Sequence, residues 1–375
     1  MLHRKGGSQR AIAKRLAVSL GAVQHWLHRA QAGAPLHDRS CAPLRQAAQT
    51  AAHIEALICE LRTSLAVHSD LGFSGPQAIA AALALRLAAK QVPSIRTIAR
   101  VLARQGLLDG TKRIRRKAPP TGWHLPALCA GHAQADTFDG IEDLPIEGVG
   151  RCHALTTKSL AGPLVGAWLN PRITAAWVVA CLAAHWHAHG LPTYAQFDND
   201  TRFQGPHNRP NVIGEVIRFC LRVGVTPVFA PPRETGFQAD IEGFNALWQA
   251  KVWRRAHHTS MAALPTASDK FCAAYTRHRA ARAEHAAQRR RFPGKPGLGP
   301  IKSGTIIFIR RTNESGAVRV LEQSYLVSSQ WPHRLVRVEL DVATRSLRFY
   351  RLRRREPLRQ PLLKKCKLIG SLRLG

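Results

Sequence analysis

Three acidic side chains in the middle of the chain are candidates for metal-dependent chemistry. They are Asp139, Asp198 and Glu242, each at the predicted end of a strand or near the start of a helix. Hard divalent cations such as Mg²⁺ prefer carboxylate oxygens and retain some of their waters. Three carboxylates can therefore hold two ions without enclosing them, and two ions can clamp one phosphate. The sequence thus predicts a site for two Mg²⁺ or Mn²⁺ ions.

The surroundings of these acids resemble a known catalytic core. Asp198 is followed by Asn199, and the Pro- and Gly-containing loop 231–236 precedes Ile241-Glu242-Gly243-Phe244-Asn245. This order resembles the integrase core of insertion-sequence transposases, whose fold family includes the retroviral integrases. In that family an Asp closes the first strand, an Asp-Asn pair ends a later strand, and a Glu stands on a helix beyond such a loop. The resemblance covers about residues 132–258.

This resemblance implies a fold, a reaction and partners. The implied fold is α/β, with a ribonuclease H-like mixed sheet as the catalytic core at 132–260. The implied reaction is hydrolytic nicking at the ends of a mobile DNA element, followed by strand transfer into target DNA. The expected partner is double-stranded DNA, and related enzymes act as multimers, so we expect a homo-oligomer on DNA.

The first acid has a rival on the same predicted strand, Asp136. Because side chains alternate between the faces of a strand, residues 136 and 139 point to opposite faces and only one joins the site. We favour Asp139, since it follows the apolar Phe138 as the first Asp of the family often follows a strand residue. Asp136 is the alternative ligand.

The third acid also has a rival, Glu234. The interval from Asp198 to Glu234 holds 35 residues, the spacing best known for this superfamily, and the interval to Glu242 holds 43. We favour Glu242 because it opens a helix with an apolar face, whereas Glu234 lies in the loop. Rigid elements hold metal ligands better than loops do. Asp240 is the neighbour most easily confused with Glu242.

The central region shows strands that alternate with helices. Predicted strands lie at 154–157, 162–169, 194–198 and 226–230, and predicted helices at 174–189, 212–223 and 239–255. A mixed sheet with helices packed on it is the expected product.

The first N-terminal unit, at 1–35, is predicted to be a helix-turn-helix. Apolar residues at 12, 16, 23 and 27 predict two short helices around a turn, with Ser19 as the cap of the second. That second helix would present Gln24, His25 and Arg29 to the major groove of DNA. An ordinary helical hairpin is the alternative. A linker is expected at 36–50.

A second helix-turn-helix-like DNA-binding domain is predicted at 51–118, with helices near 51–65, 76–89 and 94–106. Arg96, Arg100 and Arg104 recur at intervals of four and form one basic face of the last helix. This face could be solvated only, but a basic run at 112–117 follows it. We therefore interpret it as a DNA-binding surface.

The C-terminal region changes character twice. Residues 262–300 are predicted to be a basic helical linker. At 305–311, 317–327 and 335–352, apolar and polar residues alternate with period two. This pattern predicts a small antiparallel β-barrel at 301–355, followed by a disordered basic tail.

Charge identifies the class of partner. The chain has 55 Lys and Arg against 23 Asp and Glu, a net charge of +32, which predicts a polyanionic partner. Residues 1–118 carry +14, residues 119–260 carry 0, and residues 261–375 carry +18. A neutral middle between basic flanks modestly favours an enzyme that holds cations beside a phosphate. The alternative is that a globular domain of about 140 residues normally balances its charges.

Other classes of site find no support in the sequence. The eight cysteines form no Cys-x-x-Cys pair and no Cys/His cluster, which argues against a disulfide framework or a zinc site. No apolar stretch reaches the length of a membrane helix. We expect a cytoplasmic, nucleoid-associated protein without a membrane partner.

Two other functions use the same residues. A nuclease that only hydrolyses DNA would need the same ions and acids, and the sequence does not separate hydrolysis from strand transfer. A DNA-binding regulator could keep the integrase fold without activity, but the presence of all three acids argues against it.

Overall fold

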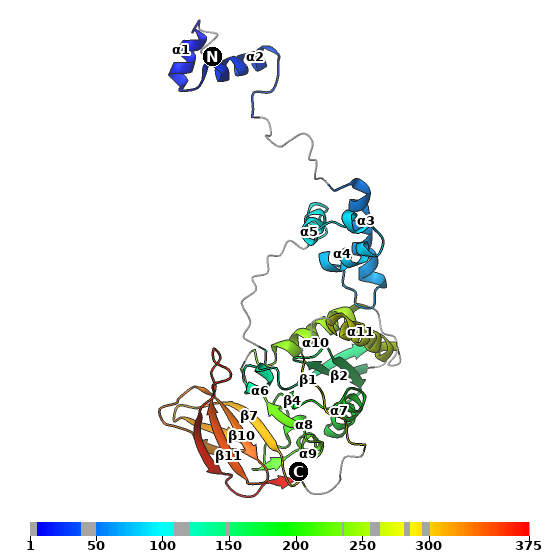
Figure 1. Cartoon of the computed structure of the whole chain (residues 1–375), viewed down its shortest axis with the longest axis vertical. Helices are drawn as coiled ribbons and strands as arrows, with labels where there is room; N and C mark the ends of the chain where they lie inside the picture. The colour runs from blue at the N-terminus through cyan, green and yellow to red at the C-terminus, as the bar shows by residue number, and fades with distance from the viewer. Residues whose placement is uncertain are drawn as a thin grey trace. The chain divides into compact units, whose positions relative to one another are not determined.

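The computed structural model describes residues 6–38, 50–108, 121–146, 150–234, 236–255, 263–280, 286–294 and 301–374 (Figure 1). The chain divides into two compact units, Met1–Ala56 and Leu57–Gly375. Most of the predicted linker and the whole basic run at 112–117 lie outside the described residues. No helix within the described ranges is long and apolar enough to cross a membrane.

The first unit contains the two predicted short helices, α1 (Gln9–Leu16) and α2 (Leu20–Gln31). The Ser19 hydroxyl accepts a hydrogen bond from the Ala22 amide at 3.1 Å and caps α2, as its position predicted. Ile12, Ala13 and Val23 form the small core between the helices. The helices are confirmed, whereas their role in binding DNA stays a prediction.

The second unit begins with three helices and one short turn of 3₁₀ helix. These are α3 (Ala52–His68), which crosses the boundary between the units, α4 (Pro76–Ala84), η1 (Ala89–Gln91) and α5 (Ile95–Arg104). The helix predicted at 76–89 ends at Ala84, and η1 is separate from it. Ser94 caps α5 by accepting from the Thr97 amide at 3.2 Å.

A nine-stranded mixed sheet forms the centre of the second unit. Its strand order is β12-β11-β10-β7-β6-β4-β1-β2-β3. The strands of its N-terminal half are β1 (Ala135–Ile146), β2 (Gly150–Ser159), β3 (Val165–Asn170), β4 (Tyr194–Phe197) and β6 (Thr226–Phe229). β1, β4 and β6 are parallel, and β2 is antiparallel to β1 and β3. The predicted α/β fold with a mixed sheet is confirmed.

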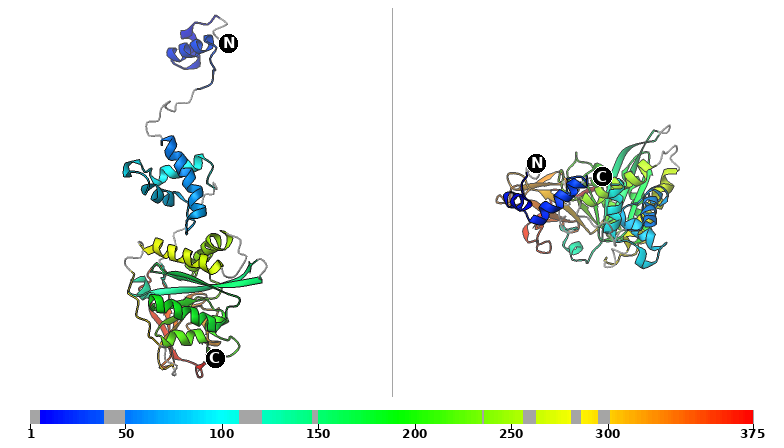
Figure 2. Two further views of the ribbon diagram at one scale, coloured as in Figure 1. Left: turned by 90° about the vertical axis from the view of Figure 1, so that its right-hand side faces the viewer. Right: turned by 90° about the horizontal axis from the view of Figure 1, so that it is seen from above.

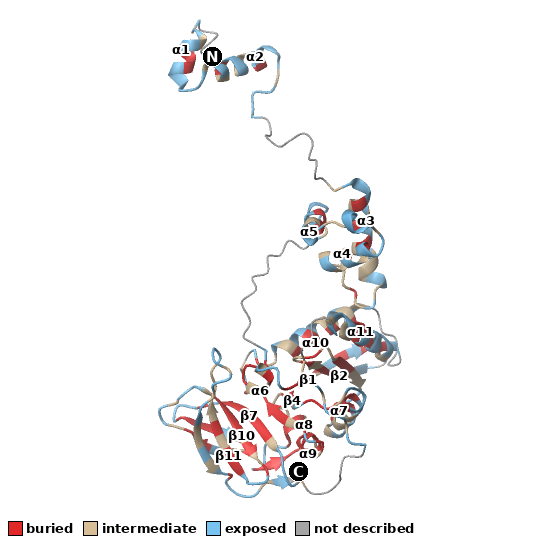
Figure 3. Cartoon of the chain, viewed as in Figure 1, coloured by how far each residue is buried: buried red, intermediate tan, exposed pale blue. Residues whose placement is uncertain are grey.

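Helices cover both faces of this half of the sheet (Figures 1 and 2). One face is covered by α7 (Ala175–His189), α8 (Thr201–Gln204) and α9 (Glu215–Arg222). The other is covered by α10 (Ala239–Lys251), which η2 (Trp253–Arg255) follows, and by α11 (Ala263–Ala280). The short helix α6 (Pro126–Cys129) precedes β1. Figure 3 shows the buried residues concentrated in the sheet and on the helix surfaces that pack on it.

Alternation along β1 assigns its side chains to these two faces. Phe138 packs in the cluster of α7 and α9 with Phe197 and Trp186, whereas Ile141 packs in the cluster of α10. The odd-numbered residues near the start of β1, including Asp139, therefore face α10.

The C-terminal strands extend the same sheet. They are β7 (Thr305–Arg311), β10 (Leu335–Asp341), β11 (Ser346–Arg351) and β12 (Leu362–Lys367). β7 pairs in parallel with β6, and the hairpin of β8 (Ala317–Val320) and β9 (Gln323–Leu326) forms a separate two-stranded sheet. The predicted small barrel is not observed among the described residues. The reason is that β7 is buried on both faces over five consecutive residues, as an internal strand must be.

The tail predicted to be disordered is partly in strands. β12 pairs with β11, and β13 (Arg373–Leu374) pairs in parallel with β5 (Val212–Ile213). The helix predicted at 212–223 accordingly begins at Glu215, because the residues before its Gly214 cap belong to β5.

Candidate active site

The backbone register places Asp139 and Asp198 on neighbouring strands. β1 and β4 pair in parallel, with Thr137 opposite Gln196. Continuing this register by two residues places Asp139 beside Asp198, immediately after the last residue of β4. Neighbouring strands lie about 4.8 Å apart, so the two carboxylates emerge close together. Asp139 does not close its strand as expected, because β1 continues to Ile146.

Asp139 is held by neutral donors. Its Oδ1 accepts from the Gly140 amide at 2.9 Å, and its Oδ2 accepts from Asn245 Nδ2 at 2.7 Å. The Asn245 carboxamide oxygen in turn accepts from the Thr156 hydroxyl at 2.6 Å. This chain of hydrogen bonds joins α10, β1 and β2, so it fixes both the orientation of Asp139 and the position of the helix.

The electrostatics show that the acids are close enough to interact. Burial and the charge of Asp198, with a smaller contribution from Glu242, raise the pKa of Asp139 to about 6, although hydrogen bonds from Gly140 and Asn245 lower it. Burial also raises the pKa of Asp198, which accepts from the Asp200 amide. When two acids interact, the one that ionises first places a negative charge beside the other. Asp198 is that charge for Asp139, so Asp139 keeps its proton to a higher pH.

Glu242 lies in the first turn of α10 and is exposed. It precedes Asn245 by three residues, and residues three apart lie on the same side of a helix. The contact of Asn245 with Asp139 therefore turns Glu242 toward the two aspartates, which accounts for its effect on the pKa of Asp139.

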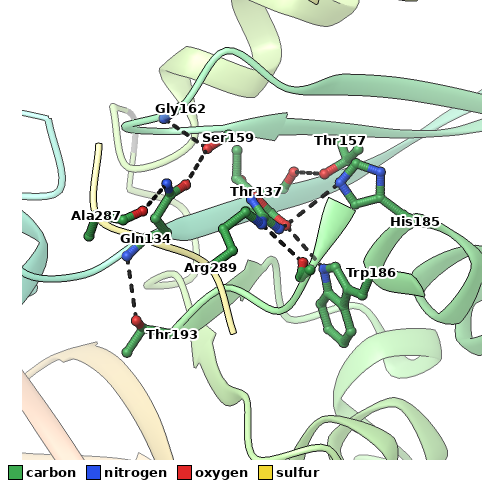
Figure 4. A network of polar contacts seen from close by, with 12 residues as sticks. Gln134, Thr137, Thr157, Ser159, Gly162, His185, Trp186, Thr193, Ala287 and Arg289 are labelled. Atoms are coloured by element: carbon green, nitrogen blue, oxygen red, sulfur yellow. Dashed lines mark hydrogen bonds and ion pairs between the residues drawn. The ribbon is translucent and has the colours of Figure 1, made fainter. Parts of the chain in front are cut away.

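Asp136 lies on the opposite face of β1, three residues before Asp139, and has a different environment. Figure 4 labels three of the side chains that surround it, His185, Trp186 and Arg289. It is fully buried, and its two oxygens accept from the two terminal nitrogens of Arg289 at 3.0 and 2.5 Å. Trp186 Nε1 also donates to it at 3.0 Å, and His185 Nε2 lies 3.7 Å away. Because its charge is already paired, Asp136 is a structural residue.

Arg289 lies in a segment that was predicted to be helical and is not. Residues 286–294 were expected within a helical linker, but they contain no helix and form a β-bridge between Arg290 and Leu191. α11 supplies the helical part of the predicted 262–300 region. The extended conformation lets Arg289 reach Asp136.

The other acids near the third position also have cationic partners. Glu234 forms an ion pair with Arg311 of β7, which lowers the pKa of the Glu234 carboxyl. Asp240 forms an ion pair with Lys158 at 2.5 Å. Glu234 and Asp240 therefore each have their charge balanced by a cation, whereas Glu242 forms no ion pair with another of the described residues.

Two cationic side chains near the candidate acids, Arg202 and Lys251, already contact other protein groups. Arg202 contacts both Glu142 and Asp200, and Asp200 caps α8. Lys251 donates to the Gly72 carbonyl at 2.9 Å. Their observed contacts are structural.

The sequence did not point to two residues that support the site. Asn245 was visible in the Glu242 motif, but its contact with Asp139 was not. Arg310 of β7 is buried and donates to Asn199 Oδ1 at 2.8 Å, beside Asp198. The second support depends on the pairing of β7 with β6, which no local pattern reveals.

The predicted DNA-contacting residues divide into two groups. Gln24 and His25 are exposed on α2, and Arg96, Arg100 and Arg104 are exposed along α5. Arg29 was predicted to face a groove, and the structure corrects this. It is buried, lies over the Trp26 ring at 4.6 Å and donates to the carbonyls of Pro35 and His37.

Comparison with known proteins gives fold likenesses only. No protein-family model and no curated protein matches the chain. The catalytic core domain of BIV integrase is 16% identical over 31% of this chain and 71% of its own, with a TM-score of 0.24. A simian T-cell lymphotropic virus intasome in complex with PP2A regulatory subunit B56 gamma is 15% identical over 69% of this chain and 84% of its own, with a TM-score of 0.31. At these scores the functional proposal has to rest on this chain's own site.

Proposed function

We propose that this chain is a DNA transposase of the retroviral-integrase type, which nicks and joins DNA strands with Asp139, Asp198 and Glu242 as ligands of two divalent ions. The observation that carries the proposal is the register of β1 and β4, which brings Asp139 and Asp198 side by side on the face that α10 covers. Asn245 then fixes α10 to β1, and Glu242 lies one turn earlier on the same side of that helix.

The charges of these residues fit a cation site. No lysine or arginine of the described residues pairs with Asp139, and the neighbouring carboxylates raise its pKa instead. Such repulsion costs stability unless a cation offsets it. As they stand, no three His, Cys, Asp or Glu side chains in the described ranges are arranged to hold an ion. The exposed Glu242 side chain would therefore have to move toward Asp139 and Asp198 when ions bind.

The roles of the side chains follow from their elements. Bound ions would activate the attacking water or 3′-hydroxyl and stabilise the leaving oxygen. Asp139 and Asp198 are the rigid ligands, since strands and hydrogen bonds fix them. Asn245 orients Asp139, and Glu242 completes the set from α10.

Recognition of the DNA ends is assigned to the helices outside this site. Gln24 and His25 on α2 would read bases in the major groove, and the arginines of α5 would bind phosphates. We further propose that the enzyme acts as a homo-oligomer that pairs two DNA ends, with the target DNA as the acceptor.

Asp198→Asn tests the proposal, because the amide keeps the shape and removes the ligand charge. With Mg²⁺ and DNA that carries the inverted repeats flanking the coding region, nicking and joining should both fall by at least about a thousandfold, roughly 4 kcal/mol in the barrier. Binding to the same DNA should persist. Asp143→Asn is the matched control, since Asp143 is an exposed acid of β1 whose carboxylate pairs with Arg151, and its left-handed backbone suits Asn.

Two outcomes would contradict this assignment. Substantial Mg²⁺-dependent cleavage by the Asp198→Asn protein would remove Asp198 from the site. If the wild-type protein cleaved DNA but never joined pre-nicked ends to a target plasmid, the enzyme would be a nuclease rather than a transposase.

A further inference from the structure

A pocket of about 1040 Å³ lies at the C-terminal half of the sheet, outside the acidic site. It contains two tryptophans, Trp123 and Trp331, and two glutamates, Glu234 and Glu356. Its six arginines, which define it here as the arginine pocket, are Arg311, Arg334, Arg351, Arg353, Arg354 and Arg355.

Three of the six arginines of this pocket lie over aromatic rings. The Arg354 guanidinium lies over the Trp123 ring at 5.4 Å, and that of Arg351 lies over the Trp331 ring at 4.5 Å. Arg334 approaches the Trp331 ring at 6.0 Å. A guanidinium stacked on a ring keeps its N–H edges available, so these side chains are preorganised to donate to an anion.

Much of the positive charge in the pocket is uncompensated. Arg311 is paired with Glu234, and Arg353 with Glu356. The remaining four arginines, namely Arg334, Arg351, Arg354 and Arg355, form no ion pair with a carboxylate of the described residues. Planar guanidinium groups bind phosphate oxygens in a bidentate manner, which makes a phosphorylated ligand the best chemical match.

The Trp123 side of the pocket lies on the same face of the sheet as the acidic site, whereas Arg351 and Trp331 belong to the opposite face and meet it at the end of the strands. Trp123 and Phe237, which line it, pack in one cluster with Ala135 and Ile309. Ala135 and Asp139 share a face of β1, since they are four residues apart on a strand. Glu234 and Phe237 also belong to the loop that leads into α10, so a strand bound at Asp139 and Glu242 can continue along this face.

We propose that the arginine pocket binds a short unpaired segment of a DNA strand, with its phosphates on Arg351 and Arg354. The identity of the strand as DNA rests on the proposed function. A volume of about 1040 Å³ is at the upper limit of sites for small ligands, which suits a few nucleotides and not a duplex. Arginines combined with aromatic rings are also the usual composition of surfaces that bind single strands.

The test uses the full chain without divalent ions. The binding of fluorescent oligothymidylate and of a duplex of equal length is measured by anisotropy over a series of salt concentrations. The Arg351→Ala/Arg354→Ala protein should bind the oligonucleotide about tenfold more weakly, and its salt slope should shrink by about 1.4, since each phosphate contact on a single strand contributes about 0.7. Its affinity for the duplex should change by less than about twofold.

Two further variants make the result specific. Lys302→Ala/Lys365→Ala removes two exposed charges from the same part of the chain outside the pocket, and it should bind the oligonucleotide like the wild type. Arg351→Lys/Arg354→Lys keeps the charge but loses the planar fork, so it should still show a measurable loss of affinity. The Asp198→Asn protein should bind normally, which separates this proposal from the catalytic one.

Several results would overturn the proposal. An unchanged affinity for oligothymidylate in the double alanine variant would show that the pocket does not bind the strand. Equal losses for oligonucleotide and duplex, or equal losses in the lysine control, would reduce it to general electrostatic attraction. Displacement of the oligonucleotide by polyglutamate of equal charge, as effectively as by unlabelled oligonucleotide, would indicate an acidic protein partner instead.

Discussion

Asp136 and Asp139 lie three residues apart on β1, and their surroundings differ in the feature that matters for a metal ligand. Asp136 is neutralised by Arg289, while Asp139 is affected by the charges of Asp198 and Glu242 and, among the described residues, accepts hydrogen bonds from neutral donors. Alternation along the strand predicted that just one of them joins the site. It did not predict Arg289, because that residue lies far away in the sequence and no local pattern records such a contact.

The pKa of Asp139 predicts how the stability of the metal-free protein depends on pH. It is raised from 3.8 to about 6, so between these values the folded state binds more protons than the unfolded state. The free energy of unfolding therefore falls as the pH rises through this window, by at most about 3 kcal/mol for this group, and levels off above it.

Asp139→Asn should remove this loss. In EDTA at pH 7.5 the variant should be more stable than the wild type by roughly 1–3 kcal/mol, and the difference should vanish near pH 4, where Asp139 is protonated. Urea denaturation of both proteins at the two pH values measures it. A variant no more stable than the wild type at pH 7.5 would mean that the acids do not repel one another as the site requires.

The two candidate glutamates, Glu242 and Glu234, differ in the element on which they lie. Glu242 stands on a helix that is fixed to β1 by Asn245, and Glu234 lies on a loop and pairs with Arg311. Glu242→Gln should therefore lower the rates of nicking and joining by orders of magnitude, as expected for a lost metal ligand. Glu234→Gln should change them by less than about tenfold.

Nicking and joining assays of the two variants in parallel decide between the glutamates. If Glu234→Gln were inactive and Glu242→Gln nearly normal, spacing along the chain would have been the better guide, and α10 would be misassigned. If both were nearly normal, the regulator interpretation would replace the enzymatic one.

The elements themselves show what a sequence pattern can predict. The helices α2, α5 and α7 and the strands β4 and β6 follow from caps and periodicity, which are local properties. The pairing of β7 with β6, by contrast, is not a local property. It depends on which strand of the folded sheet still has an unpaired edge. The alternating pattern at 305–352 fits a barrel and an extended sheet equally well, so the sequence could not distinguish them, and the predicted small barrel was not confirmed.

At the scale of the whole molecule, charge and chemistry are divided along the chain. The basic flanks of +14 and +18 surround a region of net charge 0 that contains the three acids. Under the proposed function, phosphate contacts at these flanks would attract DNA without neutralising the three carboxylates assigned to the cations. Affinity for DNA should therefore depend strongly on salt, through counterion release at the flanks.

Removal of residues 1–50 should separate recognition from general affinity. This deletion removes α1 and α2 with Gln24 and His25, but keeps α3 and α5. Preference for the inverted repeats over unrelated DNA should fall to near unity, because base contacts specify the sequence whereas phosphate contacts do not. Binding to unrelated DNA should weaken but persist, with a shallower dependence on salt.

Competition binding at two salt concentrations measures both the preference for the repeats and the affinity for unrelated DNA. Arg96→Ala/Arg100→Ala in the full chain is the comparison, since it should lower the affinities for both DNAs alike. If the truncated protein still selected the repeats as well as the full chain does, α2 would not be the reading helix, and α5 would become the candidate for base recognition.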